Sequence, residues 1–219
     1  MINLSKRLKT VADLVPASAK IVDIGCDHGL LDIYLVQNKN TNSIIASDNK
    51  ENALNNAKKN IKKYKLESII ETRLGNGLDI VEANEIDTII MSGLGTHTIV
   101  GIIINNLNKL KNVEHIIIQS NNYIDFLRKK ITNIGYHIEN EKLVKDGGII
   151  YTVIRFKKGK KHYSKKELYF GPILLKENSK LFQEKKKQDL INLKKIYKLI
   201  PKNHFHHRLK IYFQIKLFK

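Results

Sequence analysis

The residues from Asp23 to Gly29 have the composition of a loop that binds a small charged ligand. They read Asp-Ile-Gly-Cys-Asp-His-Gly and follow a short β-branched run that predicts a strand. Glycines here permit a tight turn and a close approach of the backbone to a ligand at the start of the next helix. Asp27 stands two residues after Gly25, where a dinucleotide-binding loop has its second glycine, and a carboxylate there would repel a pyrophosphate.

The charges of this loop favour a cationic cofactor. Carboxylates suit the sulfonium and ammonium groups of S-adenosylmethionine better than the phosphates of NAD or FAD. We therefore predict an S-adenosylmethionine site, to which this loop contributes Asp23, Gly25, Cys26, Asp27 and His28. The only base close to Cys26 in sequence is His28, and a covalent role for the thiol is the less favoured interpretation.

Two further segments complete the predicted cofactor site. Asp48 ends the next β-branched run, at a spacing from Gly25 that suits a carboxylate accepting hydrogen bonds from ribose hydroxyls. Alternatively, Asp48 or Asn49 caps the helix that follows. Gly75-Asn76-Gly77 follows a third run, and Asn76 would reach the exocyclic amine of the cofactor adenine unless the segment is a simple turn.

A fourth strand leads into Ser92-Gly93-Leu94-Gly95. Two glycines at the start of a helix would let a flat base approach the methyl group of the cofactor, although a Gly-x-Gly pattern alone is weak evidence. We include Gly93, Leu94 and Gly95 in the predicted catalytic set.

The elements that position these loops alternate along the chain in the manner of a parallel sheet covered by helices. The predicted strands are Ile21–Ile24, Ser43–Ser47, Ile69–Arg73, Asp87–Met91 and His115–Gln119. An amphipathic N-terminal segment precedes them, and the predicted helices between them are Leu30–Gln37, Lys50–Tyr64, Thr96–Leu110 and Asn122–Asn133.

The extended runs Tyr136–Val144 and Ile149–Phe156 are separated by Lys-Asp-Gly-Gly, which predicts an antiparallel hairpin. Five parallel strands followed by a hairpin are the layout of the class I methyltransferase sheet, a Rossmann-like α/β fold. After a basic linker, Lys157–Lys161, apolar residues recur at helical spacing and predict a two-helix extension. Its apolar stripe comprises Phe182, Leu190, Leu193, Tyr197 and Ile200, then Leu209, Phe213 and Leu217.

Charge divides the chain at the same point. The 219 residues carry a formal net charge of +18, and residues 157–219 hold 19 Lys and Arg against 4 Asp and Glu. This asymmetry indicates an anionic polymer as partner, whereas a Lys-rich genome composition would scatter lysines evenly. We predict a cofactor-binding catalytic domain over residues 1–156 and a basic RNA-binding extension over residues 157–219.

Other features restrict the setting of the protein. A single cysteine makes an internal disulfide impossible, and the apolar runs are too short to span a bilayer. His204, His206 and His207 lack the cysteines or carboxylates of a metal site. We expect a cytoplasmic protein with no bound metal and no membrane partner, and favour a monomer.

Taken in order, these motifs resemble those of the bacterial tRNA adenine-22 N1-methyltransferases over essentially the whole chain. The segments that carry the resemblance are Leu4–Leu8, Asp23–His28, Gly75–Leu78, Ser92–Gly95, Gln119–Asn121, Asp146-Gly147 and Phe170–Pro172. The chain departs from the usual pattern of that family at Asn76, Leu94, Thr96 and Ser120.

The resemblance implies a Rossmann-like catalytic domain with a coiled-coil-like helical extension that helps to hold tRNA. It also implies transfer of a methyl group to N1 of adenine 22, with Asp27 and His28 orienting either the base or the amino-acid end of the cofactor. Adenine N1 has an in-plane lone pair, so positioning and desolvation would supply most of the catalysis, and the base must be unpaired first. The alternatives are an RNA-binding protein with a degenerate cofactor site and a methyltransferase for another RNA position. An NAD-dependent oxidoreductase is disfavoured by the loop pattern.

Overall fold

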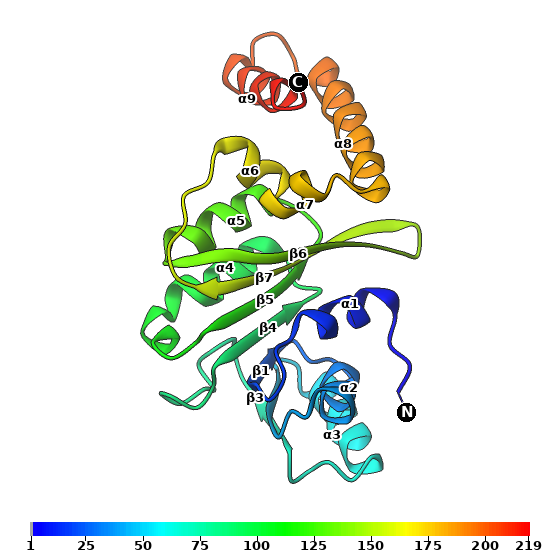
Figure 1. The fold of residues 1–219 in the computed structure, drawn as a ribbon, viewed down its shortest axis with the longest axis vertical. Helices are drawn as coiled ribbons and strands as arrows, with labels where there is room; N and C mark the ends of the chain where they lie inside the picture. Colours follow the sequence, from blue (N-terminus) through cyan, green and yellow to red (C-terminus); the bar gives the residue numbers. More distant parts are fainter. Residues whose placement is uncertain (1) are drawn as a thin grey trace.

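The alternating β-branched runs form one seven-stranded sheet in the computed structural model, which describes residues 2–219 (Figure 1). The strands are β1 (Lys20–Ile24), β2 (Ser43–Asp48), β3 (Ile70–Leu74), β4 (Thr88–Ser92), β5 (His115–Ser120), β6 (Tyr136–Asp146) and β7 (Ile149–Lys158). Their order in the sheet is β3-β2-β1-β4-β5-β7-β6. The first five strands are parallel, and β7 lies antiparallel between β5 and β6. The predicted Rossmann-like methyltransferase sheet is confirmed.

The hairpin that closes the sheet turns at two glycines. Gly147 and Gly148 have φ of 55° and 81°, the backbone that a two-residue turn between twisted antiparallel strands requires. Asp146 ends β6 and Ile149 begins β7, so the strands pair from the turn onward. Placing β7 beside β5 brings the tip of this hairpin to the end of the sheet where β4 and β5 finish.

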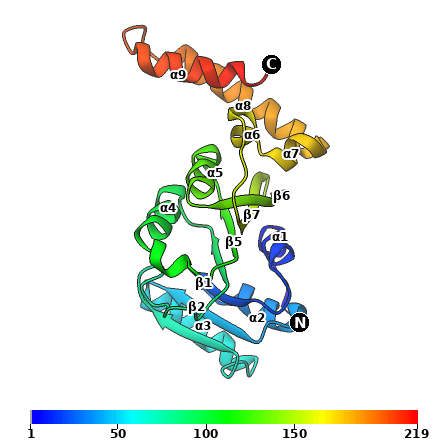
Figure 2. The ribbon, with the colours of Figure 1, turned by 60° about the vertical axis from the view of Figure 1, so that its left-hand side comes forward.

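Helices cover both faces of the sheet, because successive strand residues point in opposite directions. Helices α1 (Lys6–Leu14), α2 (Leu30–Lys39) and α3 (Glu51–Lys63) pack on the face that includes Ile21 and Ile117. Helices α4 (Thr96–Asn105) and α5 (Ile124–Asn133) pack on the face that includes Val22 and Ile116. Figure 2 shows the two groups on opposite sides of the strands.

The helix predicted over Thr96–Leu110 is interrupted. It ends at Asn105, and Leu107–Leu110 forms a separate 3₁₀ turn. The Asn106 side chain donates to the Ile102 carbonyl at 3.0 Å, and asparagine side chains that bond nearby backbone groups disfavour continuation of a helix.

Beyond β7 the chain forms four helices where two were predicted. These are α6 (Lys165–Phe170), α7 (Pro172–Glu177), α8 (Lys180–Leu199) and α9 (Phe205–Lys216). The strand β7 also continues to Lys158, into the predicted linker. Figures 1 and 2 show α8 and α9 projecting away from the sheet beyond β6.

The predicted apolar stripe is right for α8, whereas in the α9 segment only Leu217 of the three predicted residues packs in an apolar cluster. Phe182 and Leu193 of α8 and the following Ile200 are buried, whereas Leu209 and Phe213 are 37% and 58% exposed. In α9 the packed side chains are Ile211 and Ile215, with Phe218 just beyond the helix. Both sets of apolar residues recur at helical spacing, so the sequence alone does not distinguish them. In the structure, packing against α8 buries the set that contains Ile211 and Ile215.

A buried ion pair joins the extension to the sheet. Arg128 of α5 and Glu141 of β6 are 2% and 0% exposed, with Nε and Oε1 2.7 Å apart. The Arg128 guanidinium also donates to the carbonyls of Leu168 and Tyr169 at the end of α6, at 3.1 and 3.0 Å. Glu141 accepts from the backbone N–H of Ile173 in α7 at 3.2 Å. Helices α6 and α7 are therefore fixed to α5 and β6 through one pair of charges.

Candidate active site

A cavity of about 600 Å³ opens at the carboxyl ends of β1, β2, β3 and β4. In a parallel sheet this edge is the place where loops meet to bind a ligand. Its lining includes all the predicted site residues except Gly95: Asp23, Gly25, Cys26, Asp27, His28, Asp48, Asn49, Gly75, Asn76, Gly77, Gly93 and Leu94. The structure thus brings together four loops that lie up to seventy residues apart in the sequence.

The loop after β1 is held against the end of β2. The backbone N–H groups of Gly25 and Cys26 both donate to the Ser47 carbonyl, at 2.8 and 2.9 Å. Gly25 has a φ of 81°, and a Cβ there would lie 3.3 Å from the Leu94 side chain. Glycine at this position therefore keeps the backbone close to the β4 loop and leaves the cavity open between them.

Two carboxyl groups are buried beneath this loop. Asp23 of β1 is 3% exposed and Asp32 of α2 is fully buried, and neither oxygen of Asp32 accepts a hydrogen bond from a donor within residues 2–219. Burial, reinforced by the charge of Asp48, raises the pKa of Asp23 to about 7. Burial, reinforced by Asp23, raises the pKa of Asp32 well above its usual value. Two carboxyl groups that share one buried space ionise together only at high cost, so they hold a proton near neutral pH.

Cys26 does not have the environment of a nucleophile. Its thiol is buried, and burial together with the charges of Asp32 and Asp23 raises its pKa far above the ordinary value. A thiol without access to its thiolate form is unreactive. A covalent role for Cys26 therefore stays the less favoured interpretation.

Asp48 has one oxygen in a local turn and the other at the cavity loop. Its Oδ1 accepts from the Lys50 N–H at 2.9 Å, and its Oδ2 accepts from the Asp27 N–H at 3.4 Å. The N-cap position of α3 is Lys50, which has no side-chain cap, so neither Asp48 nor Asn49 is the N-cap residue. The turn holds the Asp48 carboxylate at the cavity wall.

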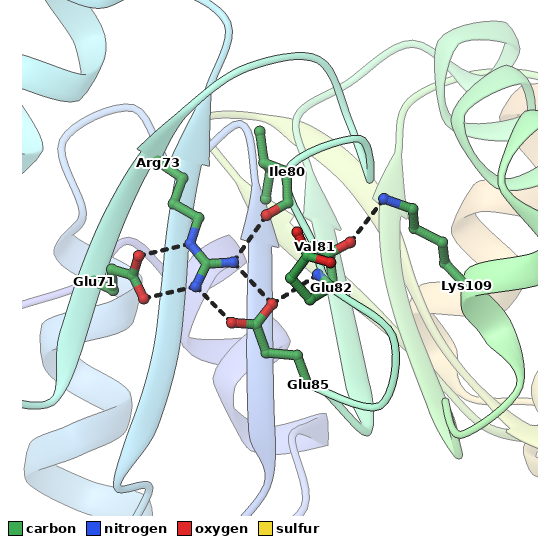
Figure 3. Close-up of polar contacts among 7 residues, drawn as sticks. All are labelled: Glu71, Arg73, Ile80, Val81, Glu82, Glu85 and Lys109. Carbon is green, nitrogen blue, oxygen red and sulfur yellow. Dashed lines mark hydrogen bonds and ion pairs between the residues drawn. The ribbon is translucent and has the colours of Figure 1, made fainter.

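The loop after β3 is anchored by Arg73 (Figure 3). The guanidinium bonds Glu71 at 2.7 Å, Glu85 at 2.8 Å and the Ile80 carbonyl at 2.8 Å. Ile80 in turn fills the space beside Gly75, where a Cβ would lie 2.2 Å from its Cγ2. Gly75 and Asn76 are thereby held in the cavity wall, and the Asn76 Oδ1 lies 3.5 Å from the Asn49 amide nitrogen.

The opposite wall includes Arg7, which the site prediction did not include, and a buried amide, Gln119, lies behind this wall. Arg7 of α1 donates from Nη1 to the side-chain oxygens of Gln119 at 2.6 Å and Ser92 at 2.9 Å. Gln119 Oε1 also accepts from the Gly93 N–H at 3.1 Å. Arg7 and Gln119 lie in segments that carried the family resemblance, but only the folded chain shows that they bond across 112 residues.

Gly95 is the one predicted site residue that does not line the cavity. It is the N-cap of α4, with φ −68° and ψ 143°, and the nearest atom to an added Cβ would be 3.8 Å away. Gly93, by contrast, has φ 81° and would place a Cβ 3.6 Å from the Arg7 guanidinium. Gly93 is therefore the glycine at which the loop backbone passes close to another side chain, and Gly95 begins the helix.

The exposed rim of the cavity carries Asp27 and His28. The His28 Nε2 and Asp27 Oδ2 atoms are 3.6 Å apart, and both side chains are more than half exposed. This pair can contact a ligand at the rim. Among residues 2–219 there is no group of three metal-ligating side chains, and no helix is long and apolar enough to cross a membrane.

This sheet order, with a glycine-rich loop after β1 and acidic side chains at β1 and β2, defines an S-adenosylmethionine-dependent methyltransferase of class I. Residues 21–219 match the family model described as tRNA (adenine(22)-N(1))-methyltransferase, named TrmK. The tRNA (adenine(22)-N(1))-methyltransferase of Bacillus subtilis is 31% identical over 205 residues, covering 91% of this chain and 86% of the relative. The chain belongs to the tRNA (adenine(22)-N(1))-methyltransferase family.

Two solved structures of relatives contain the cofactor or its product. A Streptococcus pneumoniae protein described as a putative tRNA (m1A22) methyltransferase, in complex with S-adenosyl-L-methionine, has a TM-score of 0.89 and 31% identity, covering 99% of this chain and 98% of that one. The Mycoplasma capricolum TrmK, in complex with S-adenosyl-homocysteine, has a TM-score of 0.87 and 34% identity, covering 98% and 96%. The predicted family, enzyme class and cofactor are confirmed.

Proposed function

We propose that this protein transfers a methyl group from S-adenosylmethionine to N1 of adenine 22 in tRNA, and that the cavity residues divide between cofactor and base. The observation that carries this proposal is the single cavity that joins acidic loops at β1 and β2 to the open Gly93–Leu94 loop. When bound, S-adenosylmethionine supplies an electrophilic methyl group. The protein has to place that group next to an unpaired base and keep water away.

On the cofactor side, the charges and hydrogen-bonding groups fit a cationic adenosine derivative. Asp48 accepts hydrogen bonds from the ribose hydroxyls, and the Asn76 amide oxygen accepts from the exocyclic amine of the adenine ring. Asp23 lies beneath the loop and favours positive charge in the cavity, while Gly25, Cys26 and Gly77 form walls with Asn49 and Gly75. These roles need no movement of the loops, because all of these residues already line one cavity.

On the base side, the protein has to position the adenine ring and does not have to remove a proton from N1 before the attack. Adenine N1 attacks through a lone pair in the ring plane and carries no proton that must be removed first. Gly93 and Leu94 provide a flat approach for the ring. Asp27 and His28 at the rim orient either the base or the amino-acid end of the cofactor.

The basic extension supplies most of the contacts to the tRNA backbone. Residues 157–219 hold 19 Lys and Arg, and α8 and α9 carry many of them on exposed positions. Phosphate contacts of this kind give affinity without sequence preference. We further propose that the enzyme acts as a monomer in the cytoplasm, with residues 1–156 and 157–219 as its two functional units.

Mass spectrometry of nucleosides tests the reaction directly. An unmodified tRNA transcript is incubated with the protein and S-adenosylmethionine, digested and analysed for 1-methyladenosine. The matched transcript has guanine in place of adenine 22. Methylation of the first transcript alone is expected, whereas equal methylation of both would place the target base elsewhere.

A further inference from the structure

A second cavity, of about 280 Å³, lies between the loop after β5 and helix α8. One wall consists of Asn121, Asn122 and Tyr123, and the opposite wall includes Lys185 and Asn192 of α8. The cavity therefore spans the catalytic domain and the basic extension. None of the predicted cofactor residues lines it.

A single buried amide separates this cavity from the active site. Gln119 is fully buried. Its Oε1 accepts from Arg7 and Gly93 at the wall of the cofactor cavity, at 2.6 and 3.1 Å. Its Nε2 donates to Asn121 Oδ1 at 2.8 Å, in the wall of the second cavity. One side chain thus bonds residues of both cavity walls.

The aromatic ring of Tyr123 lines this cavity, and the backbone of Tyr123 is strained. Its φ and ψ are 50° and 40°, a left-handed conformation that tyrosine rarely adopts, and its side chain is 59% exposed. The ring of His97, 5.4 Å away between centroids, supports it from α4. Thr96 donates a hydrogen bond to the Asn122 carbonyl and fixes the preceding residue. An exposed ring held this firmly beside a nucleic-acid site is a surface for stacking a base.

The charges around the cavity do not favour a phosphate as its occupant. Lys185 lies 3.0 Å from Asp189, and Arg128 is bonded to Glu141 at 2.7 Å. Lys186 lies over the Phe170 ring at 5.3 Å. Two of the three cations are therefore already neutralised, and Asp125 adds a further negative charge. A neutral planar group fits such surroundings better than an anion.

The same walls offer free hydrogen-bonding groups for the edge of a ring. The side-chain amides of Asn192 and Gln214 line the cavity and make no hydrogen bond within residues 2–219. Amides both donate and accept, as the edges of nucleobases do. Aromatic rings, unpaired amides and balanced charge together describe a site for a nucleobase.

We propose that the second cavity receives a base that flanks adenine 22 in the tRNA chain, stacked on Tyr123, while adenine 22 itself occupies the cofactor cavity. This inference rests on the proposed function, since it assigns the neighbour of the methylated base. Holding the flanking base out of the helix keeps the target unpaired. Tyr123 is a positioning residue in this arrangement and does not contact the methyl group.

Fluorescence of 2-aminopurine, which falls when the base stacks, tests the assignment. Three transcripts carry 2-aminopurine at position 22 or at the nucleotide on either side of it, and each is titrated with the protein in the presence of S-adenosyl-homocysteine. In the bound tRNA, fluorescence at one flanking position is expected to be several-fold lower with the natural chain and with Tyr123→Phe than with Tyr123→Ala, because Tyr123→Ala leaves the extruded base without a ring on which to stack.

Kinetics provide a second readout. Tyr123→Ala should lower kcat/KM for tRNA about five- to hundredfold, the range for loss of one base–aromatic stack. Affinity for S-adenosylmethionine should be unchanged, and Tyr123→Phe should restore turnover. On the opposite wall, Asn192→Ala should weaken the fluorescence change, whereas Gln188→Ala, one turn earlier on α8 and outside the cavity, should not.

The possible outcomes separate this inference from the proposed function. If the natural chain methylates adenine 22 but its fluorescence is lower than that of Tyr123→Ala only with 2-aminopurine at position 22, Tyr123 serves the target base and the assignment of a flanking base is wrong. Equal fluorescence with the natural chain and with Tyr123→Ala at every position also overturns it. Failure to methylate adenine 22 at all is a failure of the proposed function, and the nucleoside analysis reports it independently.

Discussion

At the scale of single residues, the Asp48 carboxylate has a structural role, and we propose a second role in binding the cofactor ribose. One oxygen closes a turn with Lys50 and the other faces the Asp27 backbone at the cavity wall. Asp48→Ala should weaken binding of S-adenosylmethionine by about 1.5–3 kcal/mol, the range for charge-assisted hydrogen bonds, while the protein stays folded. Calorimetric titration measures this change.

Asp48→Asn is the matched control, because it keeps an oxygen for the turn and removes the charge. It should weaken cofactor binding less than Asp48→Ala, yet measurably. If both variants bind the cofactor with the natural affinity, Asp48 does not hold the ribose and serves only the turn before α3.

The buried Asp23–Asp32 pair makes stability depend on pH. Each carboxyl group has a higher pKa in the folded chain than in the unfolded one, so the folded state binds more protons once pH exceeds the usual value near 4. The contribution of the pair to the free energy of unfolding is therefore greatest at low pH. For Asp23 this contribution decreases as the pH rises from the usual value near 4 to about 7. Alkaline conditions oppose folding at this site.

Asp32→Asn should relieve this effect. The amide cannot ionise and can donate to Asp23, so the variant should be more stable than the natural chain at pH 8, by about 1–3 kcal/mol. The gain should shrink at pH 5, where the natural pair is already protonated. Urea unfolding at the two pH values measures it, and a gain independent of pH would contradict the assignment of raised pKa values.

A site residue could be predicted from the sequence when its own type and its place in a loop after a strand indicate its role. Glycines and acidic residues after predicted strands led to twelve of the cavity residues that the structure brings together. Arg7, Gln119 and Asp32 were not predicted, because their importance arises from burial and from bonds between distant segments. Gly95 was also predicted but does not line the cavity, since two glycines in one loop look alike until their backbone angles are known.

At the scale of elements, the junction of α5, β6 and α6 depends on the Arg128–Glu141 pair. Arg128→Met would leave Glu141 buried without its cation, which costs about 3–5 kcal/mol. The free energy of unfolding should fall by that amount in denaturant titration, and tRNA methylation should fall more than cofactor affinity because α6 loses its attachment.

The double variant Arg128→Met with Glu141→Leu provides the control. Removing both charges leaves no unpaired ion, so much of the lost stability should return. If the double variant is no more stable than Arg128→Met alone, the hydrogen bonds to the α6 carbonyls, and not the charge pair, hold the junction.

Regular elements were the most predictable level of the structure. Each of the five parallel strands begins and ends within one residue of its prediction, because buried β-branched runs have clear limits. The short helices α6 and α7 were missed, since six residues show no convincing period. Their ends nevertheless carry readable signals: a Ser164–Glu167 capping box, and Gly171 before Pro172.

At the scale of the whole molecule, the charge on the extension should determine how salt affects tRNA binding. The lysines to change are exposed ones on α8: Lys187, Lys194, Lys195 and Lys198. Replacing all four by Gln should flatten the dependence of log affinity on log salt by about one for each lysine that contacts a phosphate. Binding assays between low and physiological salt measure the slope.

The control removes the same charge from the catalytic domain. Helix α3 also carries four exposed lysines: Lys58, Lys59, Lys62 and Lys63. Changing these to Gln should alter the slope less. Equal effects in the two variants would mean that net charge, and not the extension, attracts the tRNA. Substitution is preferable to truncation, because deleting residues 157–219 would strip the cover from the Arg128–Glu141 pair.

The place of α1 in the fold has a consequence for synthesis of the protein. Arg7 bonds Ser92 and Gln119 through its side chain and Asp146 through its backbone, and Arg155 donates to the Leu14 carbonyl. Helix α1 leaves the ribosome before all of these partners, so its docking site stays incomplete until the hairpin of β6 and β7 has emerged. The wall that Arg7 and Leu8 add to the cofactor cavity is consequently completed late. A nascent chain acquires its finished binding site only after most of the polypeptide has been translated.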